Sequence, residues 1–149
     1  MKKLIYGILG CLLGAQLAMG AETQWLTSVP DAEARAKAEH KLVFLNFTGS
    51  DWCEACKILD KEVLNKPEFA SYASTNLVLV TLDYPINVKQ PKELTEANDQ
   101  LQKKYNIEGF PTLMVLKPDG TVVWTHLGLV PGGLKGVLEQ LEEARKKSS

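Results

Sequence analysis

The chain has 149 residues, of which 45% are hydrophobic and 23% charged, as in a folded domain of ordinary size. Its 17 basic and 18 acidic residues leave a formal net charge of −1, so the chain lacks the basic excess of a nucleic-acid surface. No apolar run of about 20 residues follows the N-terminal segment, and we therefore expect no membrane span in the body of the chain.

The N-terminal segment has the pattern of a secretory signal peptide. Two lysines follow the initiator methionine, 4–19 is apolar apart from one glutamine, and small residues surround Gly20. Cleavage after Gly20 would make 1–20 the signal peptide and 21–149 the mature domain. It would remove two lysines and no acidic residue, taking the net charge from −1 to −3. The pattern predicts a periplasmic or secreted protein that meets the membrane only through this segment.

Two other interpretations of the N-terminus stay open. The segment could remain uncleaved as a membrane anchor. Alternatively, 8–11 resembles a lipoprotein box in which Cys11 would carry lipid. Lipid anchoring is less favoured, because the apolar run before Cys11 is short and the mature chain would begin with a second apolar run.

Helical and strand patterns alternate through the first half of the body. Ser28 can cap a helix that has a proline in its first turn, and a nearly continuous apolar run follows, as in a strand buried on both faces. In the next helix we expect Ile58, Leu59 and Val63 on the inner side. The expected elements are a helix over 32–40, a strand over 42–47, a turn over 48–51, a helix over 52–64 and a short helical turn over 65–72.

The second half ends in a hairpin and a helix. Leu94, Ala97, Leu101 and Tyr105 recur along one side of a helix, and Lys-Pro-Asp-Gly is a tight turn between two strands. The expected elements are a strand over 77–82, a loop over 83–90, a helix over 92–105, strands over 112–116 and 121–126 around a turn at 117–120, and a helix over 134–145. This order predicts an α/β fold in which a mixed central sheet has helices on both faces.

The chemistry is expected at Cys53 and Cys56, where a strand has ended and a helix begins. Cleavage of the signal peptide would leave only these two cysteines, too few for a disulfide scaffold and too close together to close a long loop. A helix N-terminus favours a thiolate, so we expect Cys53 to be the exposed attacking thiolate and Cys56, three residues later, the resolving thiol. An inert disulfide is the alternative.

A metal site is the other alternative for the cysteine pair. Structural zinc needs four ligands, and the only histidines, His40 and His126, are distant in sequence and lack ligand spacing. We therefore expect no metal and no other cofactor.

At this point the sequence resembles the thioredoxin superfamily over about residues 25–145. The resemblance depends on Trp-Cys-x-x-Cys-Lys after a buried strand, a Gly-Phe-Pro-Thr segment about fifty residues later, and the Lys-Pro-Asp-Gly hairpin. Residues 47–53 look like a bacterial exported subgroup, similar to the periplasmic C-terminal domain of the transmembrane carrier that supplies reductant to the periplasm.

The resemblance implies a substrate site beside the cysteines. It makes Pro111 a cis-proline that faces the pair, leaves the Phe110 backbone free to pair with an extended substrate, and places Trp52 at the rim. Trp25 and Trp124 are expected to be packing residues, and Glu54 an exposed one.

The sequence departs from the family at two places. Thioredoxins have a buried aspartate before the cysteines, regarded as a proton relay, where this chain has Asn46, which cannot take a proton. Asn46 could equally serve only to satisfy backbone groups. The segment 83–98 is longer than the equivalent connection; it is either a solvated loop and helix start or, less readily, a docking surface.

Two classes of function follow. The first is an extracytoplasmic thiol–disulfide oxidoreductase that takes electrons from a thiol donor and reduces protein disulfides, acting as a monomer. Glu54, between the cysteines, disfavours a very stable thiolate and so favours the reductive direction. The second is a thioredoxin-fold binding module, a chaperone or copper carrier, without redox turnover.

Overall fold

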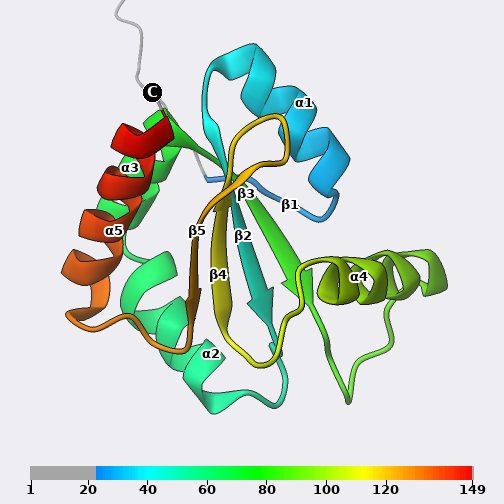
Figure 1. The fold of residues 1–149 in the computed structure, drawn as a ribbon. Helices are drawn as coiled ribbons and strands as arrows, with labels where there is room; N and C mark the ends of the chain where they lie inside the picture. Colours follow the sequence, from blue (N-terminus) through cyan, green and yellow to red (C-terminus); the bar gives the residue numbers. More distant parts are fainter. Residues whose placement is uncertain (1–22, 149) are drawn as a thin grey trace, which may run out of the picture.

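A computed structural model describes residues 23–148, so the expected signal peptide lies outside the described part of the chain. The helices and strands alternate along the chain (Figure 1). They are β1 Trp25–Leu26, α1 Val29–Glu39, β2 Leu42–Thr48, α2 Glu54–Leu59, a π-helix η1 Asp60–Leu64, α3 Pro67–Asn76, β3 Leu77–Asp83, α4 Lys92–Lys104, β4 Thr112–Leu116, β5 Val122–Leu127 and α5 Gly133–Ser148.

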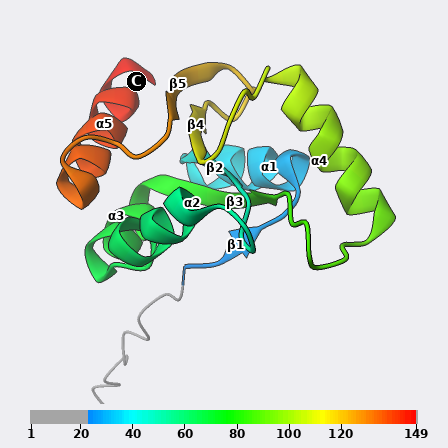
Figure 2. The same ribbon diagram turned by 90° about the horizontal axis from the view of Figure 1, so that it is seen from below.

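The five strands form one mixed sheet in the order β1-β3-β2-β4-β5. The first three of these are parallel to one another, whereas β4 pairs antiparallel with both β2 and β5. The sheet has helices on both of its faces, as Figure 2 shows from below. This is the expected thioredoxin-type α/β fold, and the hairpin from β4 to β5 is what makes the sheet mixed.

One face of the sheet packs against α2, η1, α3 and α5. Alternate residues of β2, such as Phe44, point to this face together with Leu79 and Val115 of the neighbouring strands. Phe69 of α3 meets Phe44 edge-on, with ring centroids 5.6 Å apart, and stacks on Trp25 at 6.4 Å. Because Phe44 and Phe69 are both fully buried, this aromatic group is the centre of the core on this face.

The other face packs against α1 and the end of α4. The remaining residues of β2, Val43, Leu45 and Phe47, point to this side and are fully buried. Ala32 and Ala36 let α1 approach the sheet closely, because a methyl side chain needs little space. With both faces covered, all seven residues of β2 are buried, which explains the nearly continuous apolar run in the sequence.

Three elements differ from the sequence prediction. The two-residue strand β1 was not expected, because two residues are too few to show an alternating pattern. The helix α3 has ten residues instead of a short turn. The predicted helix over 52–64 starts at Glu54 and changes to a π-helix at Asp60.

The predicted inner side of α2 is wrong at Ile58, and the predicted apolar side of α4 is interrupted at Ala97. Ile58 is 42% exposed, because the side turned to the sheet carries Cys56 and Leu59 of α2 and Val63 of η1. In α4, Ala97 is exposed and its neighbour Asn98 is buried. The cost of burying the Asn98 amide is offset by a hydrogen bond, which its Nδ2–H donates to the carbonyl of Asp83 at 3.0 Å.

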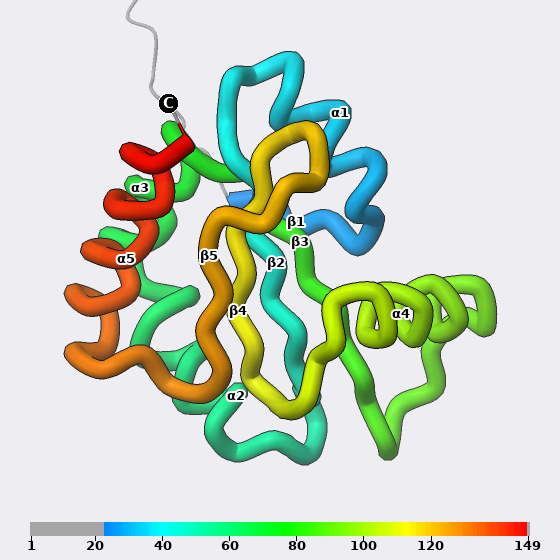
Figure 3. Tube along the Cα trace, in the orientation of Figure 1, coloured from blue at the N-terminus to red at the C-terminus, as the bar shows by residue number. Residues whose placement is uncertain are grey.

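At one end of the sheet, the carboxyl ends of β2 and β3 lie beside the amino end of β4. The start of α2, the β3–α4 connection and the turn before β4 therefore lie at the same end of the molecule, at the bottom in Figures 1 and 3. Open α/β sheets bind their ligands at this end, beyond the carboxyl ends of the strands. Within residues 23–148, no helix has the length and apolar character needed to cross a membrane.

Candidate active site

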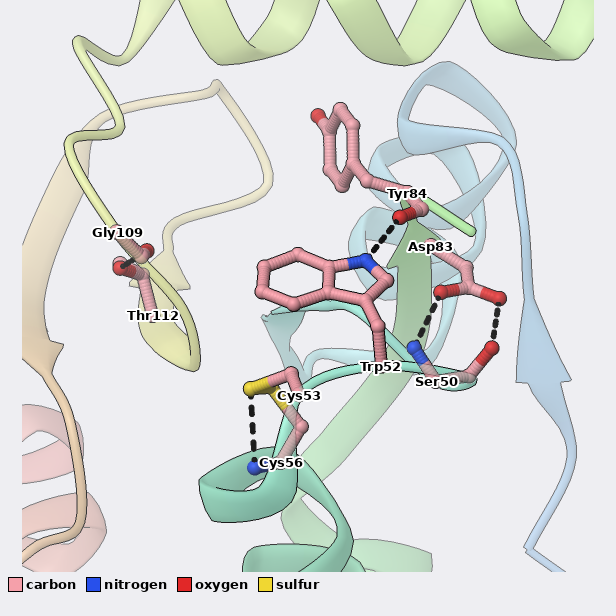
Figure 4. The surroundings of a disulfide bond; sticks show 8 residues. All are labelled: Ser50, Trp52, Cys53, Cys56, Asp83, Tyr84, Gly109 and Thr112. Atoms are coloured by element: carbon pink, nitrogen blue, oxygen red, sulfur yellow. Dashed lines mark hydrogen bonds between the residues drawn. A yellow bond between two sulfur atoms is a disulfide. The ribbon is translucent and has the colours of Figure 1, made fainter. Parts of the chain in front are cut away.

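Cys53 and Cys56 form a disulfide at the start of α2, with their Cα atoms 5.2 Å apart (Figure 4). Cys53 is the residue that caps the helix, and its Sγ accepts the backbone N–H of Cys56 at 3.2 Å. An N–H directed at this sulfur favours the thiolate form when the pair is reduced. The predicted position of Cys53 at a helix N-terminus is confirmed.

Cys53 is less exposed than predicted. Cys53 is 6% exposed and Cys56 is 1% exposed, so both belong to the buried part of the molecule. The order of the two is as expected, with Cys53 the more accessible. Glu54 between them is exposed, also as expected.

Trp52 forms one wall of the site. The residue is 42% exposed, and its Nε1–H donates to the carbonyl of Tyr84 at 2.8 Å. Gly49 makes room for the ring, because a Cβ at this position would overlap it. Figure 4 shows the indole beside the cysteine pair, with Tyr84 above it in this view, which fits the expected place of Trp52 at the rim.

The Phe110–Pro111 segment packs against Trp52. The Phe110 ring meets Trp52 edge-on at 5.7 Å and Tyr84 at 5.1 Å. The peptide bond between Phe110 and Pro111 is cis, as the resemblance implies, and Pro111 is buried. Figure 4 shows the flanking Gly109 and Thr112 across from Cys53, where the Thr112 hydroxyl donates to the Gly109 carbonyl at 2.7 Å. The fold thus brings the expected substrate-binding residues to the cysteines.

Two aspartates that we did not predict as site residues hold the surrounding loops. Asp83, at the end of β3, accepts the backbone N–H of Ser50 at 2.9 Å and also the Ser50 hydroxyl. Asp51 accepts three backbone N–H groups of the β3–α4 connection, from residues 86–88, at 3.0, 2.6 and 3.1 Å. The bond from Ile86, followed by those from the next two residues, lowers the pKa of Asp51. These bonds fix the connection to the cysteine motif.

Asn46 lies on the face of β2 that α2 covers and is 3% exposed. It lines a pocket of about 210 Å³ together with Thr48, Thr81 and Asp60. The sequence analysis missed Asp60, although its position four residues after Cys56 predicts the same side of the helix. Burial raises the pKa of Asp60, and the negative charge of Asp83 raises it further.

The two histidines belong to other elements than the cysteines. His40 ends α1 in a left-handed conformation, and His126 stacks on Trp124 in β5 with ring centroids 6.0 Å apart. In the described part of the chain, no group of three or more His, Cys, Asp or Glu side chains is placed to hold a metal ion. The contact with His126 supports the expected packing role of Trp124. The contact with Phe44 supports the same role for Trp25.

Comparison with known proteins identifies the family and the relatives of this chain. Residues 29–142 match the model of a thioredoxin-like domain. The chain is 33% identical over 126 residues to the "Disulfide bond reductase DsbH" of Chlamydia pneumoniae, covering 85% of this chain and 75% of that protein. It is 31% identical over 112 residues to the thiol:disulfide interchange protein DsbD 2 of Pseudomonas aeruginosa, which covers 72% of this chain but only 18% of that longer protein.

Solved structures agree with this relationship. A structure described as DsbH oxidoreductase superimposes with a TM-score of 0.77 at 32% identity, covering 85% of this chain and 86% of that one. The reduced C-terminal domain of DsbD from Neisseria meningitidis superimposes with a TM-score of 0.60 at 29% identity, covering 77% of this chain and 92% of the domain. The chain belongs to the thioredoxin-like domain family, as one of its thiol–disulfide oxidoreductases.

Proposed function

We propose that this protein reduces disulfide bonds in other proteins outside the cytoplasm. The observation that supports the proposal best is the Cys53–Cys56 pair at the start of α2, beside Trp52 and the Phe110–Pro111 segment. Cys53, the more accessible cysteine with an N–H directed at its sulfur, is the attacking group. The exposed Trp52 ring and the Phe110 backbone are suited to contact an extended polypeptide around its disulfide.

The reaction proceeds through a mixed disulfide. The Cys53 thiolate attacks one sulfur of the substrate disulfide and releases the other as a thiolate. The Cys56 thiolate then attacks the Cys53 sulfur, which forms the Cys53–Cys56 disulfide and releases the second substrate thiolate. The substrate gains two electrons and the cysteine pair loses two, so a thiol donor must reduce the pair before the next cycle.

The reductive direction is supported by the exposed Glu54 between the cysteines and by the similarity to the disulfide bond reductase DsbH of Chlamydia pneumoniae. A carboxylate next to Cys53 opposes the very stable thiolate that makes a strong oxidant of this fold. The location outside the cytoplasm is supported by the signal-peptide pattern of residues 1–20.

The direction is tested by equilibrating the mature protein with glutathione and measuring the fraction of oxidised pair. We expect a reduction potential below about −180 mV, the value for protein disulfide isomerase. A higher potential would make the protein an oxidant or isomerase.

The roles of the two cysteines are tested by serine substitutions in an insulin-reduction assay. We expect both Cys53→Ser and Cys56→Ser to abolish turnover and only Cys56→Ser to accumulate mixed disulfides, because that variant keeps the attacking thiol and lacks the resolving one. Accumulation in Cys53→Ser alone would reverse the assignment. A binding module without redox chemistry would show no turnover even in the unmodified protein.

A further inference from the structure

The β3–α4 connection, residues 84–91, exposes two apolar side chains at the same end of the molecule as the cysteines. Ile86 is 73% exposed and Val88 is 62% exposed, the highest values among the large hydrophobic residues of 23–148. Single exposed apolar residues are ordinary on a protein surface, so exposure alone assigns no function. Two further features distinguish this connection: it is held in place, and it adjoins the cysteine site.

Hydrogen bonds fix the connection on both sides. Asp51 accepts the N–H groups of residues 86–88, and the Trp52 Nε1–H donates to the carbonyl of Tyr84. From the other side, the Tyr84 hydroxyl donates to the carbonyl of Asn98 in α4 at 2.7 Å. The exposed side chains are therefore presented on an ordered loop, and a partner that binds them has less loop ordering to supply.

A cleft of about 350 Å³ lies between the connection and α4. Tyr84, Pro85 and Val88 give it an apolar wall, while Gln90 and Thr95 add polar groups. Its volume is at the lower end of the range for ligand sites, which are also mostly apolar with a few polar groups. An apolar side chain of a polypeptide fits such a wall, and the peptide groups beside it can bond to the polar residues.

The cleft is continuous with the cysteine site through three aromatic rings. Tyr84, which lines the cleft, meets the Phe110 ring at 5.1 Å, and Phe110 meets Trp52 at 5.7 Å. Figure 4 shows Tyr84 next to Trp52, which lies beside the cysteine pair. An extended chain advances about 3.3–3.6 Å per residue, so the cleft lies within a few residues of a cysteine bound at Cys53.

We propose that this cleft, with Ile86 and Val88, is a subsite for an apolar side chain of the substrate polypeptide, a few residues from the cysteine that Cys53 attacks. Whatever occupies the cleft also lies beside Trp52 and the cysteines. A permanent subunit there would obstruct the site, whereas a substrate has to lie there. The matching substrate is an extended segment with an apolar residue near its disulfide. The inference rests on the proposed thiol–disulfide exchange but not on its direction.

The test measures the capture of peptides by the mature protein carrying Cys56→Ser, which stops at the mixed disulfide. Each peptide has one cysteine whose sulfur carries thionitrobenzoate, in a background of serine and glycine. The Cys53 thiolate bonds to the peptide sulfur, and the electron pair of the broken bond leaves on the coloured thionitrobenzoate. A leucine is placed in turn from two to six residues before or after the cysteine. N-acetylcysteine carrying thionitrobenzoate is the small probe that does not reach the cleft.

We expect leucine at one or more neighbouring positions to raise the second-order rate constant about fivefold or more over serine, the order of effect expected for partial burial of an apolar side chain. The combined substitutions Ile86→Ser and Val88→Ser should remove this increase and leave the rate with N-acetylcysteine unchanged. Val122→Ser is the matched control, because Val122 is 43% exposed at the other end of the β4–β5 hairpin. It should leave both rates unchanged.

The proposal is overturned if leucine has no effect at any position, or if the double variant keeps the increase. It is also overturned if the double variant slows the reaction with N-acetylcysteine equally, which would show a general effect on Cys53. A dimer that the double variant dissociates in sedimentation experiments, with unchanged peptide rates, would assign the surface to a second copy instead.

Failure of the proposed function gives a different result. If Cys53 reacts with neither the peptides nor N-acetylcysteine, thiol–disulfide exchange is itself wrong, and this inference falls with it. A reduction potential in the range of an oxidant would overturn only the reductive direction, because the capture rates do not depend on it.

Discussion

At the scale of a single residue, the partial burial of Asp60 costs stability, because it disfavours the charged carboxylate. A carboxyl group whose pKa is higher in the folded than in the unfolded protein binds a proton more tightly when folded. The folded state is therefore stabilised by this group at low pH. The stabilisation is lost as the pH rises from the unfolded pKa of aspartate, about 3.9, through the higher folded pKa.

This effect predicts a pH-dependent gain from Asp60→Asn. In the oxidised protein, we expect the variant to become more stable than the unmodified protein as the pH rises above about 4, because the amide carries no charge to bury. Urea unfolding between pH 3.5 and 8 measures the difference. Glu62→Gln removes an exposed carboxylate from the same π-helix and should show no comparable trend. A constant difference between Asp60→Asn and the unmodified protein would contradict the prediction.

At the scale of elements, the β3–α4 connection is fastened to the cysteine motif by one side chain. The Asp51 Oδ1 accepts the Ile86 N–H, and its Oδ2 accepts the N–H groups of the two residues that follow. These bonds lower the pKa of Asp51, so they persist at neutral pH and are lost only when acid protonates the carboxylate. The connection carries the exposed side chains Ile86 and Val88 to the same end of the molecule as Trp52.

Asp51→Asn should loosen this connection, because an amide offers one acceptor oxygen where the carboxylate offers two. We expect the backbone amides of residues 86–88 to exchange with deuterium faster in the variant, as measured by NMR at neutral pH. Asp119→Asn is a suitable control, since Asp119 accepts a backbone N–H only in the distant hairpin turn. Equal exchange of residues 86–88 in Asp51→Asn and the unmodified protein would show that other contacts hold the connection.

A second element-scale prediction concerns α3, which joins the core through Phe69. Its ring is fully buried between Phe44 and Trp25. Phe69→Ala should lower the free energy of unfolding by about 3–5 kcal/mol, the usual range for loss of a buried aromatic side chain. Denaturant unfolding measures this loss, and Ile86→Ala, which removes a 73% exposed side chain, should change it by less than about 0.5 kcal/mol. A loss of about 1 kcal/mol or less for Phe69→Ala would mean that α3 contributes little to the core.

At the scale of the whole molecule, the location of the protein depends on residues outside the described part of the chain. The basic start, the apolar run and the small residues before Ala21 predict a mature N-terminus at that residue. Intact-mass analysis of the exported protein should give the mass of residues 21–149. Retention of Met1 would indicate an uncleaved anchor, and a lipid-modified Cys11 would indicate a lipoprotein.

The sequence by itself determined the fold class, because the α/β order depends on local patterns. The apolar runs of β2 and β3 showed strands buried on both faces, and the Lys-Pro-Asp-Gly turn showed the hairpin that makes the sheet mixed. The spacing of Cys53 and Cys56 at the start of a helix also placed the redox pair. These features were readable because each depends on neighbours in sequence.

Tertiary structure alone decided how the rest of the site is assembled. The pairing of β1 with β3 and the burial of Asn98 under the Asp83 carbonyl depend on distant segments and leave no periodic pattern. In the same way, only packing shows that Cys53 is nearly buried and that Asp51 holds residues 86–88. Asp60 could be placed one turn after Cys56 from its spacing, but its half-buried position beside Asn46 depends on how the helix packs on the sheet. Burial and long-range hydrogen bonds are properties of the packed chain, and they convert ordinary polar residues into parts of the site.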